Sequence, residues 1–362
     1  MRFSLDSVER EVVRLWDEEA RRSPAARVEL LTLVALVTEP GLFERAQNVV
    51  TDVARVHPSR TIVVRWGTGG ERAITADVAL HRGAGAIACG DALVVEATGG
   101  ARQWLPENID RLALPDLPVC IWWVGDLPDY DRLFDRMLVD ANLVIVNSGE
   151  MDLRDLELLS SIVLRSRGRC ALSDLTWIRL GPWLELVARF FDDSDARSCL
   201  RSIESITIGF SPREGDPDVA STQAGLLFGW IAHALALRPE LAVWSRGEGW
   251  GDVSFGPIVA RFERRPRADV PPGTILRVEI QAGGARFEVH REEDANVLRW
   301  SREVSGASTA PQTLRASIRE ESTLLIRCLE RPKRDALFES SLHTASRIVR
   351  PVAPRLSEAP KR

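Results

Sequence analysis

Several chemical signatures are missing from this 362-residue sequence. Only Lys333 and Lys361 are lysines. Neither follows a glycine, which excludes the phosphate-binding loop G-x-x-x-x-G-K-[ST]. The 5 histidines are scattered, with no H-E-x-x-H motif and no Cys/His pair at ligand spacing, so no metal site is predicted. The longest apolar run, 30-LLTLVALV-37, is too short to span a membrane.

Motifs for catalysis and for cofactor binding are incomplete. The segment 67-GTGGER-72 lacks the last glycine of a dinucleotide fingerprint and leads toward a strand, so we interpret it as a hairpin connection. In 207-TIGFSPREG-215, Arg213 stands where a nucleophile elbow needs its second glycine, which leaves Ser211 as a turn residue. The acidic clusters 192-DDSD-195 and 292-EED-294 are typical of solvated turns. No catalytic residue and no cofactor is therefore predicted.

Cysteine usage and charge favour the cytoplasm. The N-terminal segment alternates charged and apolar residues and lacks the apolar region of a signal peptide. A formal net charge of -5 gives no indication of nucleic-acid or membrane binding. The cysteines are odd in number and show no C-x-x-C pair, so we expect reduced thiols. They are Cys89, Cys120, Cys170, Cys199 and Cys328.

The first half of the chain has the pattern of an α/β domain. An amphipathic helix at 1–26 precedes an apolar strand at 27–38, a helix at 42–57 and a strand at 61–66. A strand–helix–strand unit predicts a right-handed parallel crossover. The alternation continues with strands at 74–81, 86–97, 117–124 and 142–148 and helices near 101–113, 129–140 and 152–166. The sequence thus predicts an α/β domain at 27–166 with a mostly parallel sheet.

The second half changes character after a basic, glycine-containing seam at 165–171. We predict an α+β domain at 170–350, with antiparallel strands and a first helix that is kinked at Pro182. Its expected helices lie at 173–191, 221–237 and 333–348, and its expected strands at 203–210, 243–263, 274–281, 285–290, 297–303 and 322–330. The Pro-rich tail at 351–362 is predicted to be disordered.

Ends of the predicted strands supply candidate anion-binding residues. Arg60, in 57-HPSRTIVVRW-66, stands at the start of one strand, and Asn147 and Ser148 finish another. Ligands of open α/β sheets collect outside the carboxyl ends of the strands. A guanidinium binds phosphate well, so these three residues are the candidates for an anion.

Tryptophan and arginine supply candidate partner-binding residues, because both types are enriched at interface hot spots. One group, Trp122, Trp123 and Asp126, lies at a strand end; the other, Trp177, Arg179 and Trp183, lies on the first helix of the second domain. Structural alternatives remain open. The adjacent tryptophans are both in the core or split between core and surface, and Arg179 is a surface or inter-domain ion-pair residue.

Four segments in order resemble the glucose-6-phosphate dehydrogenase assembly protein family, OpcA. They are HPSR at 57–60, LPVCIWW at 117–123, DLTWIRLGPWLELVA at 174–188 and, more loosely, 324-LLIRCLERPKRDALFESSL-342. The resemblance implies a non-enzymatic factor that binds glucose-6-phosphate dehydrogenase and favours its active oligomer, in support of the oxidative pentose phosphate pathway. In some relatives this activity depends on thiol redox state.

Two further hypotheses belong to other classes. The first is a sugar-phosphate-binding α/β enzyme whose site is formed by Arg60, Asn147 and Ser148 at the sheet. The second is a structural scaffold within a larger complex. Stabilisation of the isolated protein by a phosphorylated metabolite would favour the enzyme.

Overall fold

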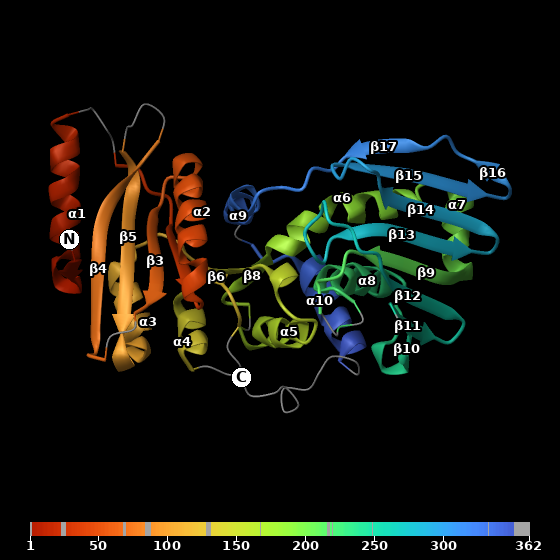
Figure 1. Cartoon of the computed structure of the whole chain (residues 1–362), viewed down its shortest axis with the longest axis horizontal. Helices are drawn as coiled ribbons and strands as arrows, with labels where there is room; N and C mark the ends of the chain where they lie inside the picture. Colours follow the sequence, from red (N-terminus) through yellow and green to blue (C-terminus); the bar gives the residue numbers. More distant parts are fainter. Residues whose placement is uncertain are drawn as a thin grey trace. The chain divides into compact units, whose positions relative to one another are not determined.

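The computed structural model describes residues 2–22, 27–67, 70–83, 88–127, 132–166, 168–215, 218, 220–247, 249–331 and 333–350. The chain forms two compact units (Figure 1). Unit 1 contains Met1–Asn147, Val163–Leu175 and Glu320–Arg334, and unit 2 contains Ser148–Ile162, Thr176–Arg319 and Asp335–Arg362. The sequence placed a single boundary between 166 and 170, whereas the chain passes between the units more than once. The predicted disorder of 351–362 lies outside the described residues.

Unit 1 is built on an 8-stranded sheet in the order β1-β4-β5-β3-β2-β6-β7-β8. The strands from β5 to β8 along this order are parallel, and β4 pairs antiparallel with β5 and with β1. The mostly parallel sheet predicted for this part is confirmed. The strands are β1 Arg2–Ser4, β2 Thr32–Val37, β3 Arg60–Trp66, β4 Ala73–Arg82, β5 Ala88–Thr98, β6 Val119–Val124, β7 Leu143–Val146 and β8 Ala171–Asp174.

Every residue of β2 and of β7 is buried, as expected for a parallel sheet that is covered by helices on both faces. One group of neighbouring helices is α2 with α9, and another is α1, α3 and α4. Their bounds are α1 Leu5–Ala20, η1 Pro40–Leu42, α2 Phe43–Val56, η3 Gly99–Trp104, α3 Leu105–Leu112, α4 Arg132–Asp140 and α9 Glu321–Glu330. Helix α5, Asp155–Ser166, contains the boundary between the units at 162/163.

Unit 2 is built on a 9-stranded sheet in the order β10-β11-β12-β9-β13-β14-β15-β16, with β17 beside β15. The pairs are antiparallel except for β12 with β9. The predicted antiparallel character is therefore confirmed with one exception. The strands are β9 Ile203–Phe210, β10 Val243–Gly247, β11 Trp250–Phe255, β12 Ile258–Arg264, β13 Ile275–Ala282, β14 Ala285–Arg291, β15 Val297–Val304, β16 Ala307–Ser308 and β17 Gln312–Arg315.

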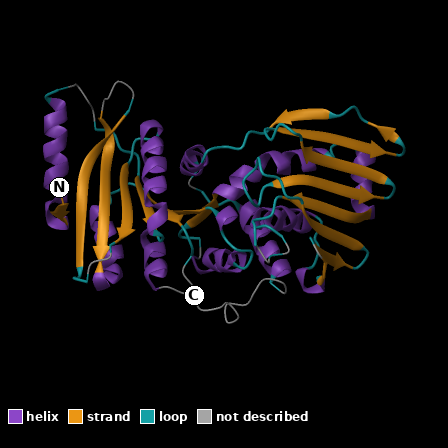
Figure 2. Ribbon diagram, viewed as in Figure 1, coloured by secondary structure: helices purple, strands orange, loops and turns teal. Residues whose placement is uncertain are grey.

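Helices pack on one face of the second sheet (Figure 2). Aromatic side chains contribute to this contact. Phe190, just after α6, lies 5.3 Å from Phe287 of β14, and Phe228 of α8 lies 5.6 Å from Phe262 of β12, between ring centroids. Strand alternation directs the charged residues of β13 and β14 to the other face. The helices of this unit are η4 Ser148–Glu150, α6 Leu175–Arg189, α7 Ser194–Ser198, η5 Cys199–Ser202, α8 Thr222–Ala234, η6 Pro239–Leu241 and α10 Ala336–Val349.

Two elements differ from the prediction. The segment 322–330 is helix α9 instead of a strand, because Leu324, Leu325, Cys328 and Leu329 recur at helical spacing and are buried together. Residues 171–174 form strand β8, and helix α6 begins directly after it at Leu175, so the first two residues of the helix predicted at 173–191 belong to a strand. No helix within the described ranges is long and apolar enough to cross a membrane.

Candidate functional site

The strand order of unit 1 reverses between β2 and β6, where an open α/β sheet places its ligand crevice. Here the crevice is closed by the chain itself. Thr38, after β2, donates from its backbone N and its Oγ1 to the Val124 carbonyl, at 3.0 and 3.1 Å. Gly125 has φ +99°, and a Cβ on it would lie 2.3 Å from Thr38 Oγ1. Only glycine permits this close approach.

Glu39 brings a negative charge to the same edge. The Asp126 backbone N donates to Glu39 Oε1 at 3.3 Å, and Trp123 Nε1 donates to the Asp126 carbonyl at 2.9 Å. Pro40, which opens η1, has no N–H to offer a phosphate. A dinucleotide pyrophosphate needs glycine-lined amide donors and a helix N-terminus free of anions. The residues of this edge do not fit such a cofactor.

The adjacent tryptophans of β6 are both in the core. Trp122 and Trp123 are 0% and 1% exposed, on the two faces of a fully covered strand. Because both indoles are buried, neither is available as a surface contact for a partner. Of the two arrangements considered from the sequence, the structure has both tryptophans in the core. Asp126 is exposed and remains accessible.

Arg60 lies in a buried ion-pair network. Its Nε and Nη2 donate to Asp91 Oδ2 at 2.9 and 2.7 Å, and its Nη1 donates to the Leu112 carbonyl at 2.7 Å and to Glu9. These partners occupy the guanidinium, so the geometry does not support Arg60 as an anion-binding residue. Arg27 and the indole of Trp16 also donate to Asp91.

The other predicted anion-binding residues lie elsewhere. Asn147 and Ser148 follow the carboxyl end of β7, whereas Arg60 begins β3. Because these strands run parallel, the two positions are at opposite edges of the sheet. Asn147 Nδ2 lies 3.4 Å from Glu321 Oε1, and Ser148 is fully buried. The structure does not bring the three predicted residues together.

The tryptophans of α6 are structural within unit 2. Trp177 Nε1 donates to Asp335 Oδ2 at 3.0 Å, and its ring lies 5.5 Å from that of Phe338 in α10. Trp183 is buried beneath the guanidinium of Arg291, 5.7 Å from the ring centroid. Of the predicted partner-binding residues on this helix, only Arg179 is partly exposed.

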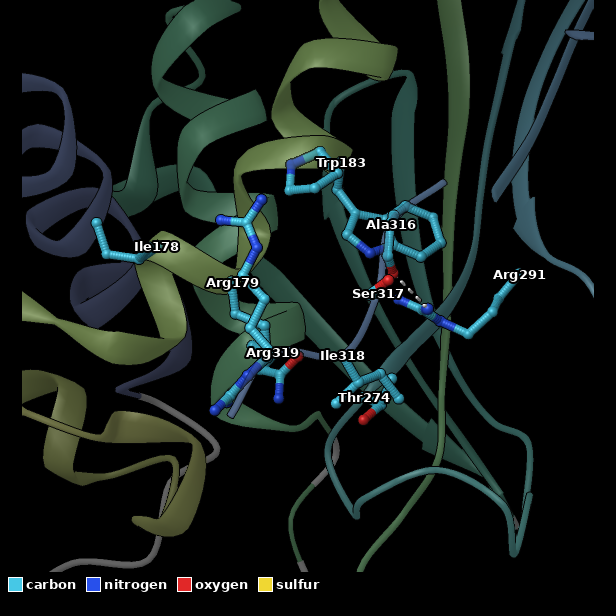
Figure 3. A pocket seen from close by; sticks show the side chains of 11 residues that line it. Ile178, Arg179, Trp183, Thr274, Arg291, Ala316, Ser317, Ile318 and Arg319 are labelled. Carbon is cyan, nitrogen blue, oxygen red and sulfur yellow. Dashed lines mark hydrogen bonds between the residues drawn. The ribbon is translucent and has the colours of Figure 1, made fainter. Parts of the chain in front are cut away.

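A pocket in unit 2 gathers residues from separate segments around Arg179 (Figure 3). It has about 480 Å³ of unfilled space, part of which is open to solvent, and about 20 Å³ is wide enough for the centre of a water molecule. In Figure 3, Arg179 projects from α6, while Arg319 belongs to the segment after β17. The lining residues are Ile178, Arg179, Pro182, Trp183, Gln223, Thr274, Arg291, Ala316, Ser317, Ile318 and Arg319.

Arg291 is a half-buried cation of this pocket. It donates to the carbonyls of Ile275 and Ala316, at 3.3 and 3.4 Å, and to that of Ala295. Burial, with a smaller contribution from the charge of Arg267, lowers the pKa of Arg291 to about 10. The sequence did not identify this site, because its members are up to 141 residues apart and share no local motif.

Buried thiols of the described region are unreactive. Burial raises the pKa of Cys120 to about 12, of Cys170 to about 11 and of Cys328 to about 12. A thiol of such pKa holds almost no thiolate at neutral pH. All 5 cysteines are free, and no group of three or more metal-ligating side chains occurs among the described residues.

Comparison with known proteins identifies two consecutive family domains. Residues 50–160 match the model of the glucose-6-phosphate dehydrogenase subunit N-terminal domain, and residues 170–342 match that of its C-terminal domain. A "Putative OxPP cycle protein OpcA" of Nostoc punctiforme is 26% identical over 85% of this chain and 69% of its own length. Proteins of the same description from Synechococcus elongatus and Synechocystis are 25% and 26% identical over 80% and 71% of this chain. The chain covers 67% and 55% of their lengths.

Solved structures resemble the chain in fold alone. An oxidoreductase from Bacillus cereus has a TM-score of 0.50 and 8% identity, over 90% of this chain and 96% of that one. The apo form of levoglucosan dehydrogenase has a TM-score of 0.49 and 9% identity, over 88% and 94%. The two family-domain matches together span most of the sequence, and the chain therefore belongs to the OpcA family of glucose-6-phosphate dehydrogenase subunits.

Proposed function

We propose that this chain binds glucose-6-phosphate dehydrogenase in the cytoplasm and favours the active oligomer of that enzyme, without catalysing a reaction of its own. The observation that carries the proposal is the pair of domain matches to a subunit of this dehydrogenase. The curated relatives are described as proteins of the OxPP cycle, which agrees with this role.

The closed edge of the first sheet supports a non-catalytic role. Thr38, Glu39 and Gly125 fill the position where a related fold would hold a dinucleotide. The sugar-phosphate enzyme considered as an alternative loses its basis, since Arg60 is buried against Asp91 and lies away from Asn147. Asp126 and Arg179 remain the accessible members of the proposed partner-binding set.

Differential binding is the mechanism that we propose. A protein that binds the active form of the enzyme more tightly than the inactive form shifts the equilibrium between them, and a tenfold preference contributes about 1.4 kcal/mol. If the active form is the larger oligomer, dilution of the enzyme disfavours it by mass action. The activating effect should therefore be greatest at low enzyme concentration.

A dilution series tests the proposal. Dehydrogenase activity is measured from about 1 nM to about 1 μM enzyme, with and without a saturating amount of this chain, alongside mass photometry of the mixtures. We expect the ratio of the two activities to rise on dilution, together with a larger complex that contains both proteins. A constant ratio of one at every concentration would refute the proposal, as would turnover of glucose 6-phosphate by the isolated chain.

A further inference from the structure

The pocket between α6, β14 and the segment after β17 has a one-sided charge. Arg179, Arg291 and Arg319 line it, with Gln223, Thr274 and Ser317 as its uncharged hydrogen-bonding residues. None of its 11 lining residues is an aspartate or a glutamate. The chain has a net charge of -5, so a pocket lined only by basic charged residues is a positively charged region on a negatively charged protein.

The charge on Arg291 is poorly compensated. The acceptors of its hydrogen bonds are the main-chain carbonyls of Ile275, Ala295 and Ala316. The nearby guanidinium of Arg267 is itself paired with Asp269, at 2.7 and 2.8 Å. Removing a cation from water is costly unless an anion faces it. The lowered pKa of Arg291 reflects the same desolvation.

Helix α8 adds a second source of positive potential. Gln223 lies in its first turn and lines the pocket, and the Ser221 hydroxyl caps the helix by accepting from the Ala224 backbone N at 3.2 Å. The positive end of the dipole of a 13-residue helix therefore lies at the pocket. Helix N-termini beside basic side chains are common positions for bound oxyanions.

A wider hollow on the same unit, with about 810 Å³ of unfilled space, also borders Arg291 but lacks the one-sided charge, because Glu288 lines it. Its other arginines are Arg265, Arg267 and Arg277. Each of these arginines is already paired with a carboxylate, that of Glu263, Asp269 and Glu288 respectively. The carboxylate of Glu288 lies in the hollow itself and would repel an external anion, so the hollow is the weaker candidate.

We infer that the pocket lined by Arg179, Arg291 and Arg319 binds a phosphate group, held by a small phosphorylated metabolite or free as inorganic phosphate. The narrow interior admits one water-sized group such as a phosphate oxygen, since about 20 Å³ exceeds the roughly 10–15 Å³ that a single water requires. The rest of the phosphate would lie in the wider part of the pocket, which is open to solvent. Ser317 is exposed and Arg319 half-buried, so the rest of a metabolite can extend into solvent. Guanidinium groups bind phosphate through paired N–H donors.

Thermal unfolding and calorimetric titration of the isolated full-length chain test this inference. The probes are inorganic phosphate and glucose 6-phosphate, with glucose and potassium chloride at equal ionic strength as controls. We expect a phosphate probe, at about 100 times its Kd, to raise the Tm by at least about 3 °C, and the controls to raise it by less than about 1 °C. A tighter Kd for glucose 6-phosphate than for phosphate identifies a metabolite; equal or weaker binding identifies the free ion.

Variants locate the site. Arg319→Gln and Arg291→Gln should each weaken the phosphate Kd at least tenfold, whereas Arg315→Gln, an exposed arginine of β17 outside the pocket, should leave it unchanged. Arg319 is the safer variant, because Arg291 also holds three carbonyls of the fold. A Tm shift equal to that of potassium chloride, or a phosphate Kd unchanged in Arg319→Gln, would overturn the inference. Neither result depends on the dehydrogenase, so the proposed function is tested separately.

Discussion

Two ion-pair networks, one in each unit, lie in different surroundings. In unit 1, Arg60 and Asp91 are 1% and 0% exposed and pair in the interior. In unit 2, Arg277, Glu279 and Arg286 form a ladder of ion pairs on one face of the sheet, and the Arg286 side chain is 53% exposed. The Arg60–Asp91 pair thus lies at low dielectric, whereas Arg286 of the ladder faces solvent although its partner Glu279 is only 8% exposed.

This difference separates charges that hold the fold from charges that can act on a ligand. A buried pair has lost its hydration, so each member depends on the other. A surface pair is screened and exchanges partners at little cost. The pocket of Arg291 stands between these cases, because Arg291 is half-buried and donates its hydrogen bonds to main-chain carbonyl groups. Charge-based function is therefore to be sought in unit 2.

The largest effect expected from this comparison is that of Arg60→Met in unit 1. The substitution leaves Asp91 buried without its main counter-charge and should lower the free energy of unfolding by about 3–5 kcal/mol. The matched change in unit 2, Arg286→Met, should cost at most about 1 kcal/mol. Urea unfolding of the three proteins measures both values. Equal losses in the two variants would contradict the distinction between the units.

A second effect concerns the pH dependence of unit 1. His81 is buried, with its Nε2 2.6 Å from Thr61 Oγ1, and burial lowers its pKa to about 4. In the unfolded chain a histidine has a pKa of about 6.5, so between pH 6.5 and 4 only the unfolded state binds this proton. The stabilising effect of neutral His81 is complete above pH 6.5 and is lost as the pH falls through this range. The full loss is about 3 kcal/mol.

The variant His81→Gln isolates that contribution from the carboxylates, which titrate in the same range. The difference in free energy of unfolding between the parent and the variant should change by about 3 kcal/mol between pH 7 and pH 4, in the direction of relative destabilisation of the parent at low pH. Urea unfolding at half-unit pH steps measures it. A difference that is constant with pH would show that His81 carries its proton equally in both states.

Much of the fold was predictable because its signals are local. The apolar run at 30–37 forms β2, and the helical spacing in 42–57 forms α2, within a few residues of the expected bounds. The error at 322–330 has a physical cause. Its apolar residues are too few to separate a period of 2 from a period of 3.6, and packing of α9 beside α2 selects the helix.

The site was not predictable from the sequence, because its geometry is not local. Arg179 was identified as a candidate, but its neighbours Arg291 and Arg319 lie more than 100 residues away in segments without a motif. Conversely, Arg60 was proposed for an anion from its position beside a strand, yet its partner Asp91 is 31 residues away on β5. Which anion a guanidinium meets is decided by tertiary pairing.

A third prediction compares helix packing inside unit 2 with a free helix surface. A Cβ added at Gly229 of α8 would lie 2.4 Å from the Ser341 carbonyl oxygen and 2.6 Å from the Ala345 Cβ of α10, so Gly229→Ala should cost about 1–3 kcal/mol. At Gly181 of α6 a Cβ would meet nothing within 4 Å. Alanine at this position gains helix propensity but precedes Pro182, whose ring disfavours the α region for a residue with a Cβ, so Gly181→Ala should change the stability by less than about 0.5 kcal/mol. Thermal unfolding with a clear Tm loss in Gly229→Ala alone confirms the pair, and equal Tm losses contradict it.

The smallest expected effect is the response of unit 1 to a dinucleotide. NADH should not quench tryptophan fluorescence saturably below about 1 mM, because Glu39 and the contact of Thr38 with Gly125 occupy the crevice at the carboxyl ends of β2 and β6. NADH is the suitable probe, since its phosphates form a pyrophosphate without a free monoester for the pocket of unit 2. The Arg319→Gln variant removes residual binding at that pocket. Saturable quenching that persists in this variant would show that unit 1 binds a dinucleotide. It would contradict the conclusion that ligand binding belongs to unit 2.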